Sequence, residues 1–493
     1  MKTTGTPFSV SIDRALKVSA GAALGLAAAC AAAFFVGAAA RLNFRYPFEY
    51  GETVMVLPLL RMGEVPWIYG DIARMPHHLM PYHPFYIYLT HLVTPLWEGI
   101  AQGSVYTSGR GVTGIAAGVC AVWIFLFCRR RAGAGRAVSA LAGLLFLSSP
   151  FMLGEATHVK PDLTALALAL AGLYLGTADA SRRGAIAGAA VCFALAFLTK
   201  QNYLFAAAAA VLWRAARGEW RTALALGGGS AALALAGVGV IAWGSGGRYW
   251  SHAFLNVNAF YAWKIFWINW GKIGPQIGAV LALGAVSAVF LAVRKRTSPA
   301  GAAGIYFFIS ASILLMLGKG GWGENHAMEP LAAACLALGS AFGSGASLWK
   351  LAAVVIVTAQ LAAYVPFHQW DPAKTRASLA ETERQMDELI PFLKSVKGPI
   401  LAENTGILIA AGLPVWYQPY EFAQMSYSGQ FDQTIILDEL RQKRYALIVV
   451  QTNFFKVKGT GRFTPEFIRT LGEHYRFAGV KHGQFFYAPK AAA

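Results

Sequence analysis

The chain has 493 residues, of which 56% are hydrophobic and only 13% are charged, and its formal net charge at pH 7 is +18. Soluble domains carry about 25% charged residues, so this composition excludes an ordinary soluble enzyme and indicates a membrane protein. A basic chain can also bind nucleic acid. Here, however, many basic residues stand in short turns between apolar runs, where they would face anionic lipid. We therefore expect membrane lipid, and no nucleic acid, as a partner.

About eleven apolar runs, each near the length of a membrane-spanning helix, precede residue 366. The predicted spans are 15–40, 109–128, 137–153, 161–178, 184–199, 202–215, 221–244, 276–293, 302–318, 328–343 and 349–366. The first run could instead be the core of a cleaved secretory signal peptide. Its apolar stretch is longer than the roughly 7–15 residues of such a core, so we expect a retained anchor.

Clusters of arginine and lysine fall in alternate connections between these spans. They are Arg129 to Arg131 with Arg136, Arg182 and Arg183, Arg214 with Arg217 and Arg221, Arg294 to Arg296, and Lys350. Basic connections face the cytoplasm in membrane proteins. This predicts a cytoplasmic N-terminus and places the loops 41–108 and 246–275, and everything after residue 366, on the opposite side.

The segment after residue 366 has the mixed composition of a soluble domain. Helical spacing of apolar residues covers 371–396 and 431–444, buried strands are expected in 398–404 and 445–452, and 479–489 is typical of a hairpin. No glycine-rich phosphate loop follows either strand, so no nucleotide site is predicted. The expected fold class is a polytopic α-helical membrane protein over 1–366, with a small C-terminal extracytoplasmic α/β domain over 367–493 that acts as a cap or docking surface.

The five cysteines all fall inside predicted spans, and no CxxC pair is present, so neither a disulfide framework nor a thiolate metal site is expected. The first long loop also contains His77, His78 and His83. Zinc ligation would need supporting acids or thiols at a defined spacing, which is not clear here. We predict no metal site, with a divalent metal in this loop as the alternative.

Ionisable groups near a membrane are costly to keep and therefore indicate function. Glu49 and Glu52 follow the first span and are three residues apart, so a helical segment would place both carboxylates on one side. A carboxylate at an apolar boundary has a raised proton affinity and can act as a general base. A solvated loop pair just outside the membrane is the simpler alternative.

Two more predicted connections on the same side contain charged residues. Asp162 begins the fourth span, where it could simply cap the helix, but Lys160 has no such explanation. Lys200 and Gln201 interrupt two apolar runs, and Lys200 either reaches out to lipid phosphate or points inward to a bound phosphate.

The segment 316–330, MLGKGGWGENHAMEP, combines four glycines with Glu324, Asn325 and His326. Glycines of this kind allow the backbone to pass close to a ligand or headgroup, although a tight turn between helices would look similar.

These features together resemble the GT-C glycosyltransferases that use polyprenyl-phosphate sugars, most closely the protein O-mannosyltransferase and lipid A aminoarabinose transferase branch. FEYGE (48–52) stands where that branch has an acidic pair, LLRMGEVPW (59–67) is similar to its turn, and HPFYIYL (83–89), with His83 and Tyr86, is similar to its aromatic segment. Aligned without gaps, Glu49 falls on the family's Glu and Phe48 on its Asp. Whether Glu49 or Glu52 is the base stays open.

The resemblance extends to the segments around Asp162 and Lys200, where VKPDL and LTKQ are similar to family motifs. It implies an inverting glycosyltransferase of a bacterial inner membrane that moves a sugar from a polyprenyl-phosphate donor to an unidentified glycan, lipid or protein acceptor on the extracytoplasmic side. Lys200, with Lys160 and Arg61, would hold the donor phosphate. The implied site lining is Asp162, His83, Tyr86, Gln201, Glu324, Asn325 and His326. No cofactor is required in that branch.

A lipid-linked sugar transporter or flippase is the alternative function. Such folds usually show repeated halves and charges at the middle of the membrane. No repeat relates residues 1–200 to 200–366, and the charges cluster outside the predicted spans instead. A scaffold without catalysis would leave the acidic first loop unexplained.

Overall fold

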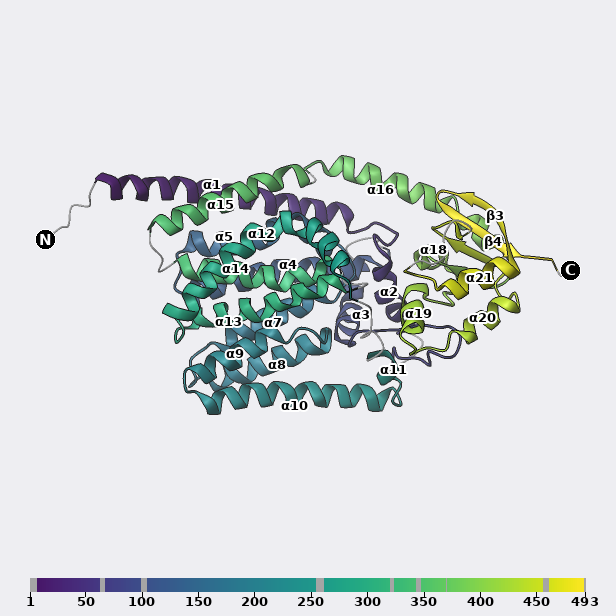
Figure 1. Ribbon diagram of the computed structural model, residues 1–493, viewed down its shortest axis with the longest axis horizontal. Helices are drawn as coiled ribbons and strands as arrows, with labels where there is room; N and C mark the ends of the chain where they lie inside the picture. The colour runs from purple at the N-terminus through teal and green to yellow at the C-terminus, as the bar shows by residue number, and fades with distance from the viewer. Residues whose placement is uncertain are drawn as a thin grey trace.

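The computed structural model describes residues 7–62, 67–98, 104–253, 261–319, 323–342, 347–368, 370–454 and 461–491. Figure 1 shows a bundle of long helices that occupies most of the molecule and a smaller part with a β-sheet at one end. The bundle is built from residues before 368 and the sheet from residues after 399.

A helix stands at the position of each apolar run predicted to span the membrane. In chain order these are α1 (Pro7–Arg41), α4 (Thr107–Leu126), α5 (Arg136–Ser148) with α6 (Pro150–Ala156), α7 (Asp162–Gly176), α8 (Arg183–Thr199), α9 (Phe205–Ala216), α10 (Trp220–Gly244), α12 (Trp263–Arg294), α13 (Pro299–Ala311), α14 (Met328–Phe342) and α15 (Ser347–Tyr364). Short π or 3-10 turns extend some of them: η1 (Phe127–Arg131), η2 (Ser312–Gly318), η3 (Glu324–Ala327) and η4 (Val365–Phe367).

Six of these helices are long and apolar enough to cross a membrane, and a seventh span results if α5 and α6, bent by 69°, are counted as one. The helices α7, α8 and α9 are apolar but have only 15, 17 and 12 residues, below the roughly 20 that a bilayer requires. The structure also corrects the predicted loop 246–275: α12 already begins at Trp263 and continues through Pro275.

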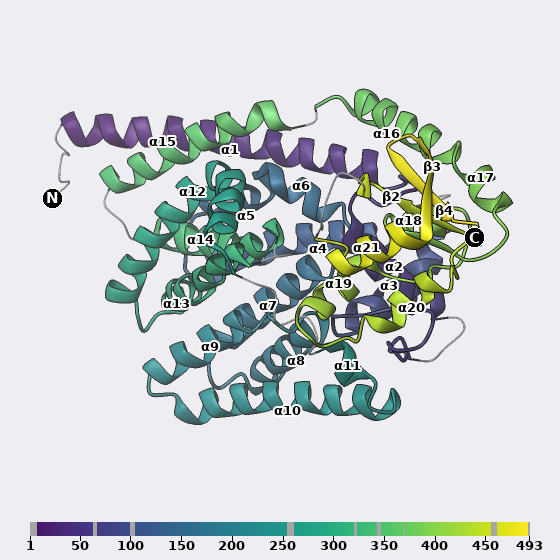
Figure 2. The ribbon, with the colours of Figure 1, turned by 45° about the vertical axis from the view of Figure 1, so that its right-hand side comes forward.

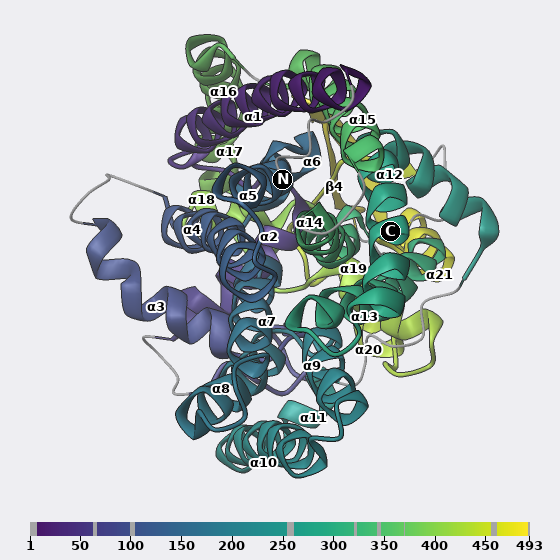
Figure 3. The ribbon, with the colours of Figure 1, turned by 90° about the vertical axis from the view of Figure 1, so that its left-hand side faces the viewer.

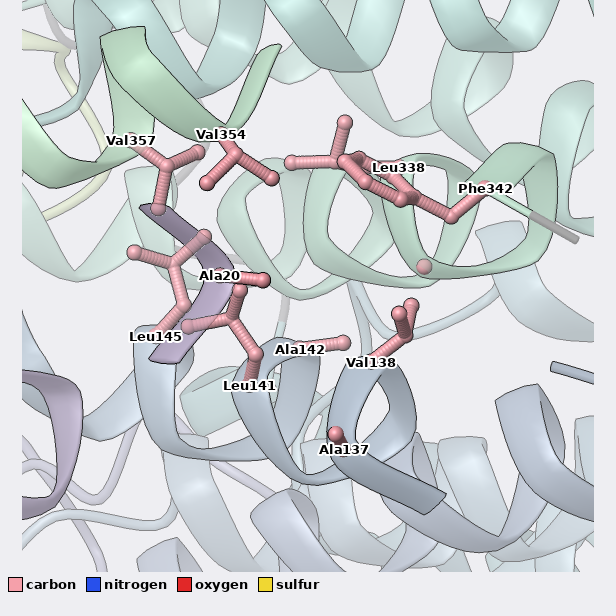
Figure 4. Close-up of a pocket in the computed structure, with 11 residues that line it drawn as sticks. Ala20, Ala137, Val138, Leu141, Ala142, Leu145, Leu338, Phe342, Val354 and Val357 are labelled. Carbon is pink, nitrogen blue, oxygen red and sulfur yellow. The ribbon is translucent and has the colours of Figure 1, made fainter. Parts of the chain in front are cut away.

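The bundle core consists mainly of alanine, leucine and phenylalanine side chains, and all five cysteines are free. Small residues let the helices approach closely: a Cβ added at Gly143 of α5 would lie 2.6 Å from the carbonyl oxygen of Ala121 in α4. Helix α15 packs along α1, as Figure 2 shows. Between α1, α5, α14 and α15 lies a small apolar pocket of about 40 Å³, lined by residues such as Leu141 and Val354. The lining residues that Figure 4 shows are apolar, so this pocket has no side chain that could act in catalysis or bind a charged group.

Several basic residues meet at one end of the bundle. The side chain of Arg131 donates to the carbonyl of Tyr174 (3.0 Å), and that of Arg214 donates to the carbonyl of Gly176 (2.8 Å). Both acceptors lie at or near the C-terminal end of α7. Because α7 begins at Asp162, its other end carries the residues predicted to form the site.

The loop 41–108 contains two helices, α2 (Tyr50–Arg61) and α3 (Phe85–Glu98). Figure 3 shows α3 at the periphery of the bundle. Residues 63–66, which include part of the turn similar to the family's, lie outside the described residues, as do 320–322 of the glycine-rich segment. A five-residue helix, α11 (Tyr249–Ala253), follows α10.

The C-terminal part surrounds a four-stranded sheet of order β1-β2-β4-β3, in which β1 and β2 are parallel and the other pairs antiparallel. Its strands are β1 (Ile400–Ala402), β2 (Leu447–Val450), β3 (Tyr475–Lys481) and β4 (Gln484–Pro489). Its helices are α16 (Pro372–Asp387), α17 (Ile390–Ser395), α18 (Thr405–Ala410), α19 (Pro419–Tyr427), α20 (Thr434–Arg441) and α21 (Pro465–His474).

This part packs on the loop 41–108. The backbone N–H of His77 donates to the carbonyl of Trp416 (2.8 Å), and Thr405 of α18 donates to Thr53 of α2 (2.8 Å). Leu79 belongs to the same apolar core as strands β1, β2 and β4. The sheet is therefore anchored over the segment that contains Glu49 and Glu52.

Candidate active site

A cavity of about 600 Å³ lies where one end of the helical bundle meets α2 and the C-terminal part. Its charged or histidine lining residues are Glu49, Lys160, Asp162, Lys200, Lys319, His326, Glu421 and Arg462. Its other polar or aromatic lining residues include Tyr50, Tyr82, Gln201, Asn202, Asn325 and Tyr420. Segments far apart in the sequence thus supply one polar chamber.

Glu49 lies at the entrance to helix α2 and faces this cavity. The helix begins at Tyr50, and Glu49 has extended backbone angles (φ −143°, ψ 162°) with no side-chain cap hydrogen bond. Its Oε1 lies 2.8 Å from the Nζ of Lys160, and its side chain is 36% exposed. Gly51 leaves room beside it, because a Cβ there would lie 3.0 Å from the same oxygen.

Glu52 has different surroundings, because its side chain is 0% exposed and does not line the cavity. Its two oxygens accept from Nε and Nη2 of Arg110 in α4, each at 3.0 Å. Oε1 also accepts from the backbone N–H of Val159 (2.9 Å), and Oε2 from that of Phe48 (2.5 Å). Glu52 therefore binds α2 to α4 and to the 157–161 loop. Both acids contact that loop, but only Glu49 is open to a ligand.

Lys160 stands between two carboxylates. Besides Glu49 it contacts Glu155 of α6, whose Oε2 is 3.2 Å from Nζ. Burial lowers the pKa of Lys160, but Glu155 and Glu49 outweigh that effect and raise it well above its usual range. The side chain is a permanent cation at the cavity wall.

Lys200 points inward rather than toward lipid. Its Nζ lies 2.6 Å from Oδ1 of Asp162 and 5.1 Å from the centre of the Tyr82 ring, and the side chain is 6% exposed. The same Oδ1 accepts from Nδ2 of Asn325 at 3.0 Å. The N-cap of α7 is Pro161, and the Asp162 carboxylate in the first turn is bonded to the side chains of Lys200 and Asn325. Asp162 therefore does more than cap the helix, and Lys200 is not in contact with lipid.

His326 lines the cavity next to these groups. Burial, with the nearby charge of Lys200, lowers its pKa to about 3, so the imidazole is neutral at pH 7. Gln201, also in the lining, donates from Nε2 to the carbonyl of Pro81 (3.0 Å).

Besides Glu52, four further residues expected at the site do not line the cavity. Arg61 does not line the cavity, and its Nη1 lies 3.5 Å from Nδ1 of His78. His83 is hydrogen-bonded to the carbonyl of Phe197 (2.6 Å) and to the hydroxyl of Tyr249 (2.7 Å). Tyr86 is buried, and its hydroxyl donates to the carbonyl of Gly109 (2.9 Å). Glu324 precedes Asn325 but is not in the lining.

No sequence pattern indicated that residues of the C-terminal part would line the cavity. Glu421 of α19 accepts a hydrogen bond from the Tyr50 hydroxyl (2.6 Å). The guanidinium of Arg462 lies 5.0 Å from the centre of the Tyr50 ring, and its Nη1 is 3.1 Å from Oε1 of Glu403. Arg110 was also missed, since a lone arginine inside an apolar run gives no indication of its partner.

The histidines of the first loop do not converge on one point. His77 is hydrogen-bonded to the carbonyl of Ile72 (3.0 Å), whereas Nε2 of His78 is hydrogen-bonded to the carbonyl of Val415 (2.7 Å). Within the described residues, no three His, Cys, Asp or Glu side chains are grouped so that they could hold a metal ion. Acids around the cavity are instead paired with cations, as in the ion pairs of Lys160 with Glu49 and of Lys200 with Asp162.

No protein-family model matches the sequence, and no curated protein sequence matches it either. The fold, in contrast, is similar to solved structures. ArnT from Cupriavidus metallidurans bound to undecaprenyl phosphate has a TM-score of 0.62, with 13% identity, over 95% of this chain and 98% of that one. The oligosaccharyltransferase AglB from Archaeoglobus fulgidus, in complex with an inhibitory peptide and a dolichol-phosphate, has a TM-score of 0.53, with 11% identity, over 93% of this chain and 74% of that one.

This chain has the same fold as ArnT and AglB. The similarity to ArnT covers nearly the whole of both chains, so it includes the C-terminal part as well as the bundle. At 13% identity, the similarity extends to the fold and not to individual residues.

Proposed function

We propose that this protein is an inverting glycosyltransferase that moves a sugar from a polyprenyl-phosphate donor to an acceptor hydroxyl or amine. The observation that supports it most is the cavity, in which a carboxylate, Glu49, and two inward cations, Lys160 and Lys200, line one chamber. The GT-C fold adds support, since ArnT binds undecaprenyl phosphate and AglB a dolichol-phosphate in structures of the same fold.

Glu49 is the proposed general base. The acceptor nucleophile forms a bond to the anomeric carbon while the bond from that carbon to the phosphate oxygen breaks. The phosphate leaves with the bonding electrons, and the acceptor's proton passes to the Glu49 carboxylate. Glu52 is not suited to this role, because Arg110 and two backbone N–H groups occupy both of its oxygens.

Lys200 and Lys160 are the proposed phosphate ligands. The leaving phosphate gains negative charge as the sugar departs, and fixed cations in a site with little water stabilise that charge strongly. Asp162 and Asn325 orient Lys200, while Gln201 and His326 complete the wall. Arg61 falls outside this assignment because it does not line the cavity. With these cations in place, the proposed step requires no metal.

The proposed side of the membrane is the extracytoplasmic one, in a bacterial inner membrane. Helix α7 runs from Asp162 at the cavity to Gly176, beside which Arg131 and Arg214 gather. Basic residues of this kind face the cytoplasm, so the cavity and the C-terminal part face the other way. A flippase is less suited to this arrangement, because the charged chamber lies at one end of the bundle and not at its middle.

Transfer can be tested without knowing the sugar. Membranes from a strain lacking the protein are incubated with the purified protein, and polyprenyl-phosphate sugars are followed by mass spectrometry. We expect the wild type to consume one such lipid and release polyprenyl phosphate, and Glu49→Gln to be slower by a factor of about 100 or more. Glu324→Gln, a nearby acid outside the lining, is the matched control. If the wild type consumes no polyprenyl-phosphate sugar, the proposal is wrong.

A further inference from the structure

The candidate base is held in an ion pair by one of the cations assigned to the donor. Nζ of Lys160 lies 2.8 Å from Glu49 and 3.2 Å from Glu155. The Lys160 side chain is 17% exposed and that of Glu155 only 9%, whereas that of Glu49 is 36% exposed and open to the cavity. The ammonium of Lys160 thus occupies Oε1 of Glu49, and that oxygen is not free to take a proton from an acceptor.

A phosphate in the cavity would compete for the same ammonium. It offers several acceptor oxygens, and Lys200 lines the same cavity as a second cation. Glu155, on the inner side of Lys160, can keep its contact when Glu49 gives up its own. The Glu49 side chain can move away from Lys160, because Glu49 precedes α2 and makes no cap hydrogen bond. Gly51, which has no side chain, leaves space beside it.

We propose that Lys160, besides binding the donor phosphate, makes the base dependent on the donor. Without donor, Lys160 is paired with Glu49. When the donor binds, its phosphate takes over the ammonium, and the Glu49 carboxylate becomes free to accept a proton. This inference rests on the proposed function and adds an order of events to it: the donor binds first, and the acceptor is deprotonated only afterwards. When the lipid phosphate leaves, Lys160 returns to Glu49 and promotes release of the captured proton to water.

The competition can be measured with undecaprenyl phosphate alone, by its binding to the purified full-length protein in detergent. Glu49→Gln removes the competing carboxylate, so we expect undecaprenyl phosphate to bind roughly tenfold more tightly. Lys160→Met should weaken binding. In the double variant of Glu49→Gln with Lys160→Met, the gain from Glu49→Gln should disappear, because the cation for which Glu49 competes is gone.

Glu421→Gln is the matched control, because it removes an acid of the same cavity that has no ion pair with Lys160. Measured at pH 8, its effect on binding should add to that of Lys160→Met rather than vanish with it. Equal affinity of Glu49→Gln and the wild type would overturn the inference, as would a gain that persists without Lys160. A wild type that does not bind undecaprenyl phosphate at all would instead overturn the proposed function. A cooperative thermal unfolding transition in each variant shows that it is folded.

Discussion

The carboxylate of Glu421 accepts a hydrogen bond of 2.6 Å from the hydroxyl of Tyr50, although 371 positions separate the two residues. This bond joins α19 of the C-terminal part to the first residue of α2, next to Glu49. Both residues line the cavity. The C-terminal part is therefore a wall of the candidate active site as well as its cover.

Glu421 should make the stability of the protein depend on pH near neutrality. Burial raises the pKa of Glu421 to about 7, an effect that the Tyr50 hydrogen bond and Arg462 only reduce. A carboxyl whose pKa is raised in the folded state stabilises it fully at low pH, and this contribution is lost as the pH rises from about 4 to 7. The loss is at most about 3 kcal/mol. Thermal unfolding in detergent from pH 5 to 8 should show a falling midpoint, which Glu421→Gln should flatten. An equal slope in that variant would contradict the prediction.

Glu52 should prove to be a structural residue. Removing one partner of a buried ion pair leaves the other charge without compensation, at a cost of about 3–5 kcal/mol. We expect Glu52→Gln and Arg110→Met each to lower the thermal unfolding midpoint clearly, and the double variant to lose less than the sum of the two. Glu49→Gln, at a half-exposed position, should leave the midpoint nearly unchanged. If Glu52→Gln were fully stable but inactive, Glu52 and not Glu49 would be the better candidate for the base.

The positions of the bundle helices could be predicted from the sequence because apolar length is a local property. Their ends could not always be predicted. Residues 246–275 were expected to form a loop, yet α12 begins at Trp263 and contains Pro275. The short lengths of α8 and α9 were apparent, since the predicted spans 184–199 and 202–215 are about as short as the helices Arg183–Thr199 and Phe205–Ala216.

The candidate site could be predicted only in part. Charges next to apolar runs stand out in the sequence, so it was possible to predict Glu49, Lys160, Asp162 and Lys200. The separate surroundings of Glu49 and Glu52 depend on Arg110, which lies 58 residues from Glu52. The contribution of Glu421 depends on packing of the C-terminal part on the first loop, and no local pattern encodes such a contact.

Lys200 should be needed for binding of the lipid phosphate, and its removal should also lower the stability of the protein, because Asp162 loses its buried ion-pair partner. Lys200→Met removes the cation but leaves Asp162 with the hydrogen bond from Asn325. We expect the affinity for undecaprenyl phosphate to fall by a factor of about 10 or more, since a charge-assisted contact of this kind contributes about 1.5–3 kcal/mol. Lys319→Met, which changes another lysine of the cavity wall outside the Asp162 cluster, is the comparison. An unchanged affinity in Lys200→Met would remove Lys200 from the phosphate site.

The proposed orientation predicts which surface residues a membrane-impermeant thiol reagent can reach. Ser378 is exposed on α16 of the C-terminal part, and Ser181 is exposed between α7 and α8 near the basic end of the bundle. Four of the five native cysteines are buried, so the wild type gives a low background of labelling. In cells with an intact inner membrane, Ser378→Cys should be labelled directly, and Ser181→Cys only after permeabilisation. The reverse pattern would place the cavity and Glu49 on the cytoplasmic side, where the donor's sugar would have to face the cytoplasm for transfer to occur.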